Sequence, residues 1–205
     1  TTSVTGPVVL SGIGLLTVSS GAVVSGATIS GGIPTVSVLN GGQMVSSTEL
    51  NGFLMVDSGG VISDNILNSD VVTLSAGASS TKDTFINSGA GADGYATVTV
   101  ASGATLNDAT VANGPVAGLS AVVASGATVS GLSVGSGGTA TVSSGALVTA
   151  VSVDAGSVVS MGSVYGNGIS NTSPIKAGAT VLSNCVVSLC PSQRDRQKAR
   201  MPSSA

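Results

Sequence analysis

The stretch Thr17-Val18-Ser19-Ser20-Gly21 sets the pattern of this chain. Similar stretches occur later in the sequence, as Thr99-Val100-Ala101-Ser102-Gly103-Ala104 and Thr141-Val142-Ser143-Ser144-Gly145-Ala146. We call the glycine of each such phrase an anchor, and successive anchors are 20, 18, 18, 26, 23, 19 and 21 residues apart. A period near twenty residues is typical of a chain built from similar coils. The anchors are Gly21, Gly41, Gly59, Gly77, Gly103, Gly126, Gly145 and, with a weaker match, Gly166.

A second glycine follows most anchors after 11 or 12 residues. The Gly59 unit differs, with Asn68-Ser69-Asp70 at that place. The first half of each unit is therefore nearly constant in length, and the second half absorbs insertions, of which residues 90–102 and 115–125 are the longest. These second glycines are Gly32, Gly52, Gly89, Gly114, Gly137, Gly156 and Gly178.

Apolar residues keep register with the anchors, at three and eight residues beyond them. An odd and an even offset on one strand would face opposite ways, so the chain must bend between them. The Gly41 unit fits with a one-residue slip, which gives Val45 and Leu50, and the Gly77 unit keeps Phe85 but has Ser80 in place of an aliphatic residue. The regular pairs are Val24 and Ile29, Ile62 and Leu67, Leu106 and Val111, Val129 and Val134, and Val148 and Val153.

These units predict an all-β fold, a right-handed parallel β-helix of about eight coils with the apolar pairs inside. A helical reading is disfavoured because glycine costs about 1 kcal/mol at a helix interior position. Stacked coils require the same offsets in each unit, since each valine must lie on the one below it. With strands about 4.8 Å apart, eight coils give a rod on the order of 40 Å long.

Composition excludes several functions. Charged residues are 7% and aromatic residues 2% of the chain, the net charge is −3 and there is no histidine. No basic stripe or stacking aromatic surface is present for nucleic acid. A Ser–His–Asp triad cannot form, and no run is long enough for a membrane-spanning helix. Because the sequence begins at Thr1 with no visible signal peptide, we expect a mature or excised fragment.

The C-terminal end has a different character. We place the solenoid domain at residues 1–190 and a basic, disordered tail at 191–205, where four of the six basic residues gather: Arg194, Arg196, Lys198 and Arg200. Cys185 and Cys190 could form a local disulfide in an oxidising compartment or remain free thiols. No second cysteine cluster completes a zinc site, and we expect no cofactor.

The repeats resemble a known family. Val56-Asp57-Ser58-Gly59-Gly60 and the two anchor phrases that end in alanine are similar to the roughly nineteen-residue strand-loop-strand repeats of self-associating bacterial autotransporter adhesins, the AIDA and antigen 43 type. Asn107-Asp108-Ala109-Thr110-Val111-Ala112-Asn113-Gly114 is similar to the second half of that repeat. The likeness covers about residues 9–187. The barrel that completes an autotransporter is absent from this sequence, and the repeats here are irregular.

That resemblance implies a passenger domain, secreted or displayed on a bacterial cell surface, that acts in adhesion, autoaggregation or biofilm formation. Its partners would be copies of itself or host-surface glycans and proteins. The resemblance also implies O-glycosylation by a dedicated glycosyltransferase, although serines at these places could instead only shape the turn. The matching positions are Ser20, Ser58, Ser102, Ser125 and Ser144.

Rival functions are weaker in the sequence. An end-to-end fibre or matrix component would use the open ends of the rod. We do not expect an enzyme, although Asp64 and Asp108 share the turn five residues past their anchors and a carboxylate pair is what a glycosidase needs. Residues 89–94 faintly resemble a calcium-binding turn but occur once. Ice binding would need threonines at one outward offset, and two residues past the anchors only Thr105 and Thr128 qualify.

Overall fold

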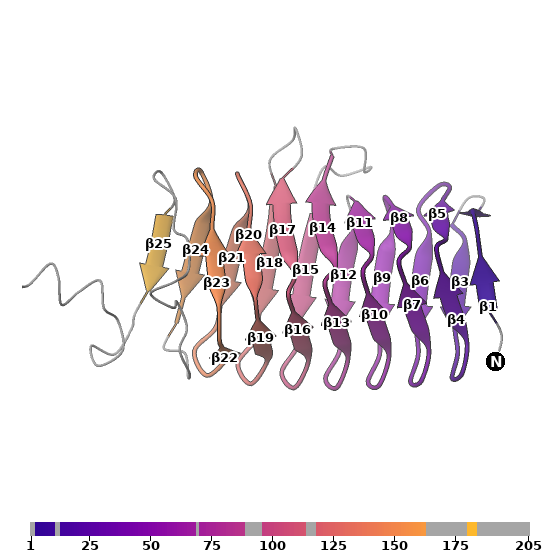
Figure 1. Ribbon diagram of the computed structural model, residues 1–205, viewed down its shortest axis with the longest axis horizontal. Coiled ribbons are helices and arrows are strands. Elements are labelled where there is room, and N and C mark those ends of the chain that lie inside the picture. Colours follow the sequence, from indigo (N-terminus) through magenta and orange to yellow (C-terminus); the bar gives the residue numbers. More distant parts are fainter. Residues whose placement is uncertain are drawn as a thin grey trace, which may run out of the picture.

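The computed structural model describes residues 3–10, 13–68, 70–88, 96–113, 118–162 and 180–183. These residues form strands and no helix. The strands belong to three parallel sheets, A, B and C, and the strands of each sheet follow one another along the long axis of the rod (Figure 1). Sheet A contains β1 (Ser3–Thr5), β4 (Val23–Ser25), β7 (Gln43–Val45), β10 (Val61–Ser63), β13 (Ser79–Thr81), β16 (Thr105–Asn107), β19 (Thr128–Ser130) and β22 (Leu147–Val148).

The other two sheets follow the same order along the rod. Sheet B contains β2 (Val8–Val9), β5 (Thr28–Ser30), β8 (Thr48–Leu50), β11 (Ile66–Asn68), β14 (Thr84–Asn87), β17 (Thr110–Asn113), β20 (Leu132–Val134) and β23 (Val151–Val153). Sheet C contains β3 (Leu15–Val18), β6 (Thr35–Val38), β9 (Phe53–Val56), β12 (Val71–Leu74), β15 (Ala96–Val100), β18 (Leu119–Val123), β21 (Thr139–Val142), β24 (Val158–Met161) and β25 (Thr180–Ser183).

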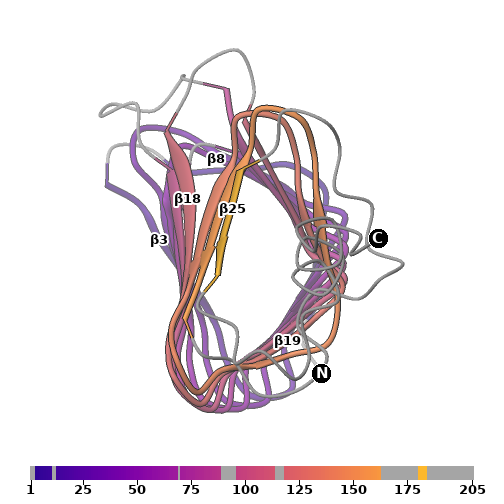
Figure 2. The same ribbon diagram turned by 90° about the vertical axis from the view of Figure 1, so that its left-hand side faces the viewer.

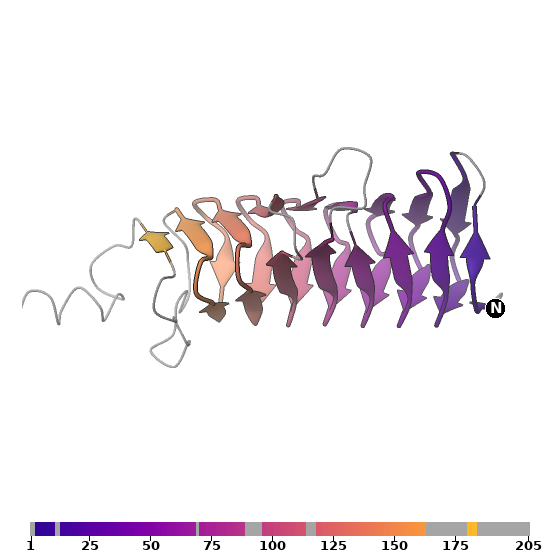
Figure 3. The same cartoon turned by 90° about the horizontal axis from the view of Figure 1, so that it is seen from above.

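The chain is a right-handed parallel β-helix, as predicted. Each strand pairs in parallel with the strand of the next coil, about twenty residues further along. Figure 2 looks along the rod with its C-terminal end toward the viewer. In this view the chain passes from sheet C through the anchor turn to sheet A, then to sheet B and back to sheet C, in a counter-clockwise direction. Because the chain also advances toward the viewer, the helix is right-handed. Figure 3 shows the same coils from above, with the sheets enclosing a narrow interior.

The anchor glycines stack on one edge of the rod. The N–H of Gly21 donates to the carbonyl of Gly41 at 2.9 Å, and the pattern continues through Gly126, which donates to Gly145 at 3.1 Å. All seven anchors from Gly21 to Gly145 have φ between 74° and 88°. This left-handed conformation favours glycine because it carries no Cβ, which explains why the anchors recur. The eighth predicted anchor, Gly166, lies outside the described residues.

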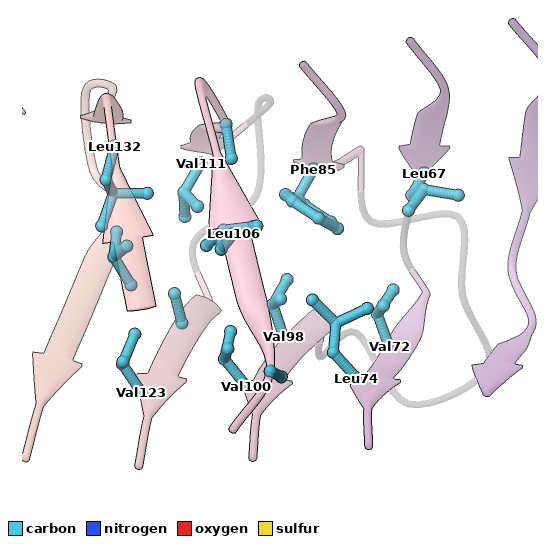
Figure 4. Packing of buried hydrophobic residues seen from close by; sticks show 14 of the residues in the cluster. Leu67, Val72, Leu74, Phe85, Val98, Val100, Leu106, Val111, Val123 and Leu132 are labelled. Carbon is cyan, nitrogen blue, oxygen red and sulfur yellow. The ribbon is translucent and has the colours of Figure 1, made fainter. Parts of the chain in front are cut away.

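The predicted apolar pairs line the interior. Residues three past the anchors come from sheet A and residues eight past them from sheet B, and all ten members of the regular pairs are buried. Sheet C adds two inward rows of its own, one with Val72 and Val98 and the other with Val100 and Val123. Figure 4 shows these side chains meeting between the sheets, with Phe85 the largest of them. Small β-branched side chains suit this thin core.

The Gly41 unit corrects one prediction. No slip occurs: Met44 and Glu49 occupy the inward places and are fully buried, whereas Val45 and Leu50 are only partly buried on the outside. The predicted slip followed the apolar residues Val45 and Leu50 alone. Backbone register with the neighbouring coils decides instead, because a one-residue shift would turn every side chain of the strand over.

The corner between sheets A and B contains a buried polar column, which we call the corner column: Ser47, Asn65 and Asp83, each six residues past an anchor. The N–H of Ala27 donates to Ser47 Oγ at 3.1 Å, and the N–H of Asn65 donates to Asp83 Oδ1 at 2.8 Å. Ser80, the polar residue at an inward place, is fully buried and donates to Asp83 Oδ2 at 2.6 Å. Its hydroxyl is thus satisfied inside the rod.

The corner between sheets B and C is the irregular one. Gly137 and Gly156 lie in turns there with φ of 72° and 78°, as a glycine turn requires. The predicted insertions 90–102 and 115–125 are partly regular structure, since β15 and β18 lie within them and pair in sheet C. Gly89, Gly114 and Gly178, both cysteines and the tail 191–205 lie outside the described residues.

Candidate functional site

Two surfaces of the rod carry the candidate functional residues, and the first is the edge beside the anchors. We define the anchor edge as the residues that immediately precede the seven stacked anchors. All of them are exposed. Because the anchors stack, all five serines named as candidates for glycosylation lie in one row at intervals of one or two coils. The row is Ser20, Asn40, Ser58, Ala76, Ser102, Ser125 and Ser144.

The serine hydroxyls lie over the glycines of the next coil. A Cβ placed on Gly41 would come within 2.7 Å of Ser20 Oγ, and one on Gly126 within 2.6 Å of Ser102 Oγ. The same holds for Ser125, whose Oγ lies 2.6 Å from the Cβ position of Gly145. The hydroxyls of Ser20, Ser58, Ser102 and Ser125 therefore each occupy space that a Cβ on the next anchor would need.

The second surface is the outward face of sheet C from β3 to β24, which we call the hydroxyl wall. Its outward residues stand in two rows, which from β3 to β21 lie four and six residues before the anchors. In the first row Thr73 pairs with Thr99, then Val122, Thr141 and Ser160 follow. The hydroxyl-bearing members of the wall are Thr17, Thr35, Ser37, Thr73, Thr97, Thr99, Ser120, Thr139, Thr141 and Ser160.

The remaining outward places of the wall are apolar, and none in its described strands is charged. They are Leu15, Phe53, Met55, Val71, Val122 and Val158. Leu15 and Met55 expose 65% and 47% of their surface. The wall thus offers hydroxyl and methyl groups in regular rows about 4.8 Å apart along the rod.

Charges lie at the corners instead. Asp64, Lys82 and Asp108 occupy successive positions in the exposed turn between sheets A and B, with φ of 57°, 57° and 48°. Lys82 stands between the two aspartates, which therefore lie two coils apart and not in adjacent coils. In the described residues no group of three or more His, Cys, Asp or Glu could hold a metal ion. The calcium-like stretch 89–94 lies outside them.

The interior contains a carboxyl pair that the sequence analysis did not identify. Glu49 and Asp70 are buried, at 0% and 2% exposure. Burial raises the pKa of Glu49 well above its usual range, and the nearby charge of Asp70 raises it further. Burial also raises the pKa of Asp70 to about 7, although backbone hydrogen bonds from Gly52 and Asn68 act to lower it. The signal was present in the sequence, since Glu49 stands eight residues past its anchor.

The hydroxyl wall was also missed. The sequence analysis looked for rows of threonine only at the position two residues past each anchor. In the structure these residues lie in sheet A. The rows instead precede the anchors on sheet C, and the recurring threonine-apolar-threonine triplets Thr97-Val98-Thr99 and Thr139-Ala140-Thr141 were their signal. The hydroxyl of Thr139 donates to the carbonyl of Leu119 at 3.1 Å, which fixes that side chain on the wall.

Comparisons with known proteins add little to this description. No protein-family model matches the sequence, and a search of curated proteins finds no match. Among solved structures, the chain is similar to the crystal structure of a TibC-catalysed, hyper-glycosylated TibA fragment, with 21% identity, a TM-score of 0.40, and coverage of 89% of this chain and 81% of that one. The described residues contain no helix that is long and apolar enough to cross a membrane.

Proposed function

We propose that this chain is an adhesive passenger, secreted or displayed on a bacterial cell surface, and that the hydroxyl wall is its contact surface. The observation that carries the proposal is the absence of charge from every outward place of the wall in β3 to β24, together with exposed Leu15, Phe53 and Met55. A long, flat, uncharged face can lie against another such face without stranding a desolvated charge. The resemblance of the anchor phrases to adhesin repeats supports the same function.

The partner we favour is a second copy of the chain, with host-surface glycans as the alternative. A neutral glycan and the hydroxyl wall of a second copy both present uncharged hydroxyl groups, so either partner could form hydrogen bonds with the hydroxyl rows. A fibre that grows end to end would instead use the edge strands β1, β2 and β3 at one end of the three sheets. These edges offer unpaired backbone groups to another chain.

Clumping of beads coated with the full chain tests this function. Thr99→Lys with Thr141→Lys places two like charges in one row of the wall. The matched control, Asn107→Lys with Ser130→Lys, does the same on the outer face of sheet A. We expect the wall variant to abolish clumping and glycan binding while the control retains both. Equal clumping by the wall variant would contradict the proposal. Loss of clumping only after Ser3→Pro in β1 would favour end-to-end growth.

Glycosylation of the anchor edge belongs to the same proposal. Ser102, Ser125 and Ser144 are exposed, so an added sugar would extend into solvent and would not enter the packed interior. Intact-mass spectrometry of the chain purified from its native cells tests this. Hexose-sized or heptose-sized increments that map to these serines would support it, and a mass equal to that of the bare sequence would reject it.

Ice binding is a second candidate function, which the regular rows of the wall favour. From β12 to β24 every outward place is Thr, Ser or Val. Threonine and valine have nearly the same shape, so this part of the wall is a regular grid, repeating about every 4.8 Å along the rod and interrupted only by the smaller Ser120 and Ser160. Ice recrystallisation assays with the unmodified chain and with the Thr99→Lys, Thr141→Lys variant test it. Crystal growth that the unmodified chain does not slow would exclude this function.

A further inference from the structure

The carboxyl pair of Glu49 and Asp70 has no role in the surfaces described above. Glu49 lies in β8, where its neighbours in the inward row of sheet B are Ile29 in β5 and Leu67 in β11. An aliphatic side chain is the rule at that place. Asp70 precedes β12 at the corner between sheets B and C, at the place that Gly52 occupies one coil earlier. Two adjacent coils therefore each contribute one carboxyl group to the interior.

Gly52 brings the two groups together. Its N–H donates to Asp70 Oδ1 at 2.5 Å, and Glu49 Oε1 lies 2.7 Å from the point where a Cβ on Gly52 would stand. Both oxygens of Glu49 and the second oxygen of Asp70 are buried and have no hydrogen-bond partner. Three of the four carboxyl oxygens are therefore unsatisfied, which is rare for buried polar atoms.

No positive charge in the described residues faces the pair. Apart from Ser47 and Asn65 of the corner column, the other inward side chains of the same coils are aliphatic or thioether groups. Asp83, the next interior carboxyl group, lies at the other corner and is bonded by Ser80 and Asn65. Lys82 and Asp64 are exposed in the outer turn, and Asp57 lies in the anchor turn. The inward residues around the pair are Ile29, Met44, Leu54, Ile62, Leu67 and Val72.

Two adjacent carboxylates in such a place would repel each other and would both lose their hydration. One proton between them removes a charge and supplies a donor for an unsatisfied oxygen. We propose that Glu49 and Asp70 form a proton-operated latch, which holds the coils of Gly41 and Gly59 together while the pair keeps its protons and loosens them when those protons pass to solvent.

The direction of the pH effect follows from the same groups. In the opened coils both carboxyl groups ionise near their ordinary pKa values of 3.8 and 4.5, whereas in the closed coils the pKa of Asp70 is about 7 and that of Glu49 is higher than its ordinary value. The closed state therefore binds more protons, so its stability is full below about pH 4 and decreases as the pH rises through 7. Because a solenoid is held by nearest-neighbour contacts, the loss stays local.

Hydrogen exchange of the whole chain tests the latch. The protection factors of the amides in β8, β11 and β12 should decrease between pH 5 and pH 7. After correction for the intrinsic exchange rate, we expect a decrease of about tenfold per pH unit for each proton that only the closed coils bind. The apolar coils of β18, β19 and β20 should change little over the same range. Uniform pH dependence along the rod would contradict the proposal.

Three variants make the test specific. Glu49→Leu restores the aliphatic residue found at Leu67, and Glu49→Gln keeps the shape without a titrating group. Asp70→Asn serves if either one fails to fold. Each removes one of the two titrating groups, so the pH dependence at β8 and β11 should decrease by the proton that the replaced group binds, and Asp64→Asn, an exposed control in the coil of Asp70, should leave it unchanged. Unchanged pH dependence in a folded Glu49 or Asp70 variant would overturn the latch.

Discussion

The backbone N–H of Ser47 donates a hydrogen bond of 2.9 Å to Oδ1 of Asn65, one coil further along the rod. Asn65 in turn donates from Nδ2 to the carbonyl of Met44 at 3.0 Å and to Asp83 Oδ1 at 2.8 Å. The sharp bend between sheets A and B turns these backbone groups away from the regular sheet bonds. Buried side chains of the corner column satisfy them, so successive coils are joined at the corner as well as through the strands.

Asn65→Ala should remove these bonds and leave the Ser47 amide unsatisfied. A buried group left unpaired costs about 1–3 kcal/mol, and we expect a loss of that size in the free energy of unfolding. Urea titration followed by circular dichroism measures it. Asp64→Asn, one residue away and exposed, should lie within about 0.5 kcal/mol of the unmodified chain. Equal effects of the two substitutions would mean that the corner column is not stabilising.

Val129→Asp should bury an unpaired charge in the middle of the rod and cost several kcal/mol. Val129 is fully buried in β19, whereas its neighbour Ser130 faces outward. Ser130→Asp is therefore the matched control and should be nearly neutral. Thermal unfolding of the two variants compares them directly, and a larger effect at Ser130 would show that the strand faces the other way.

Gly126→Ala should cost more than Gly103→Ala. Both glycines have φ near 80°, so both substitutions carry the same left-handed strain, but only the Gly126 Cβ meets a serine hydroxyl, at 2.6 Å from Ser102 Oγ. Turning that side chain out of its rotamer adds about 0.5–1.5 kcal/mol. Adding Ser102→Ala to Gly126→Ala should remove the difference. A double variant no more stable than Gly126→Ala would contradict the stacking of the anchor edge.

Ser80→Ala should destabilise the chain more at pH 8 than at pH 4. Burial raises the pKa of Asp83, and the hydrogen bond from Ser80 opposes this by stabilising the carboxylate. Without the hydroxyl the folded-state pKa rises further, so folding favours the protonated form and stability decreases more steeply with pH. Denaturant midpoints at the two pH values measure the effect. A larger loss at pH 4 would contradict it.

The sequence predicted the fold well because stacking makes each unit repeat the same offsets. Val24 and Ile29 in one coil and Val129 and Val134 in another have the same inward places, and periodicity alone identified them. The candidate serines also came together because they precede anchors that stack. In both cases the number of residues from the anchor determines where the side chain lies on the rod.

The errors arose where chemistry and register disagreed. The prediction for the Gly41 unit followed the apolar residues alone and took Leu50 as the inward one, yet pairing with the neighbouring coils fixes the strand and places Glu49 inside. Asp70, one coil away, lies beside it. That pairing depends on how a coil closes at the corner between sheets B and C, which has no fixed spacing in the sequence. The hydroxyl wall was missed because only one outward offset was tested, and three sheets have several.

Distances between spin labels along sheet A test the stacked architecture most directly. In a chain whose two cysteines are replaced by serine, labels at Ser25 and Asn107 lie four strands apart, at Ser25 and Ser130 five, and at Thr5 and Ser130 six. With strands about 4.8 Å apart, the backbone separations should be about 19, 24 and 29 Å. Distances that increase by one strand spacing at each step support the solenoid. Distances that do not increase in this order would contradict it.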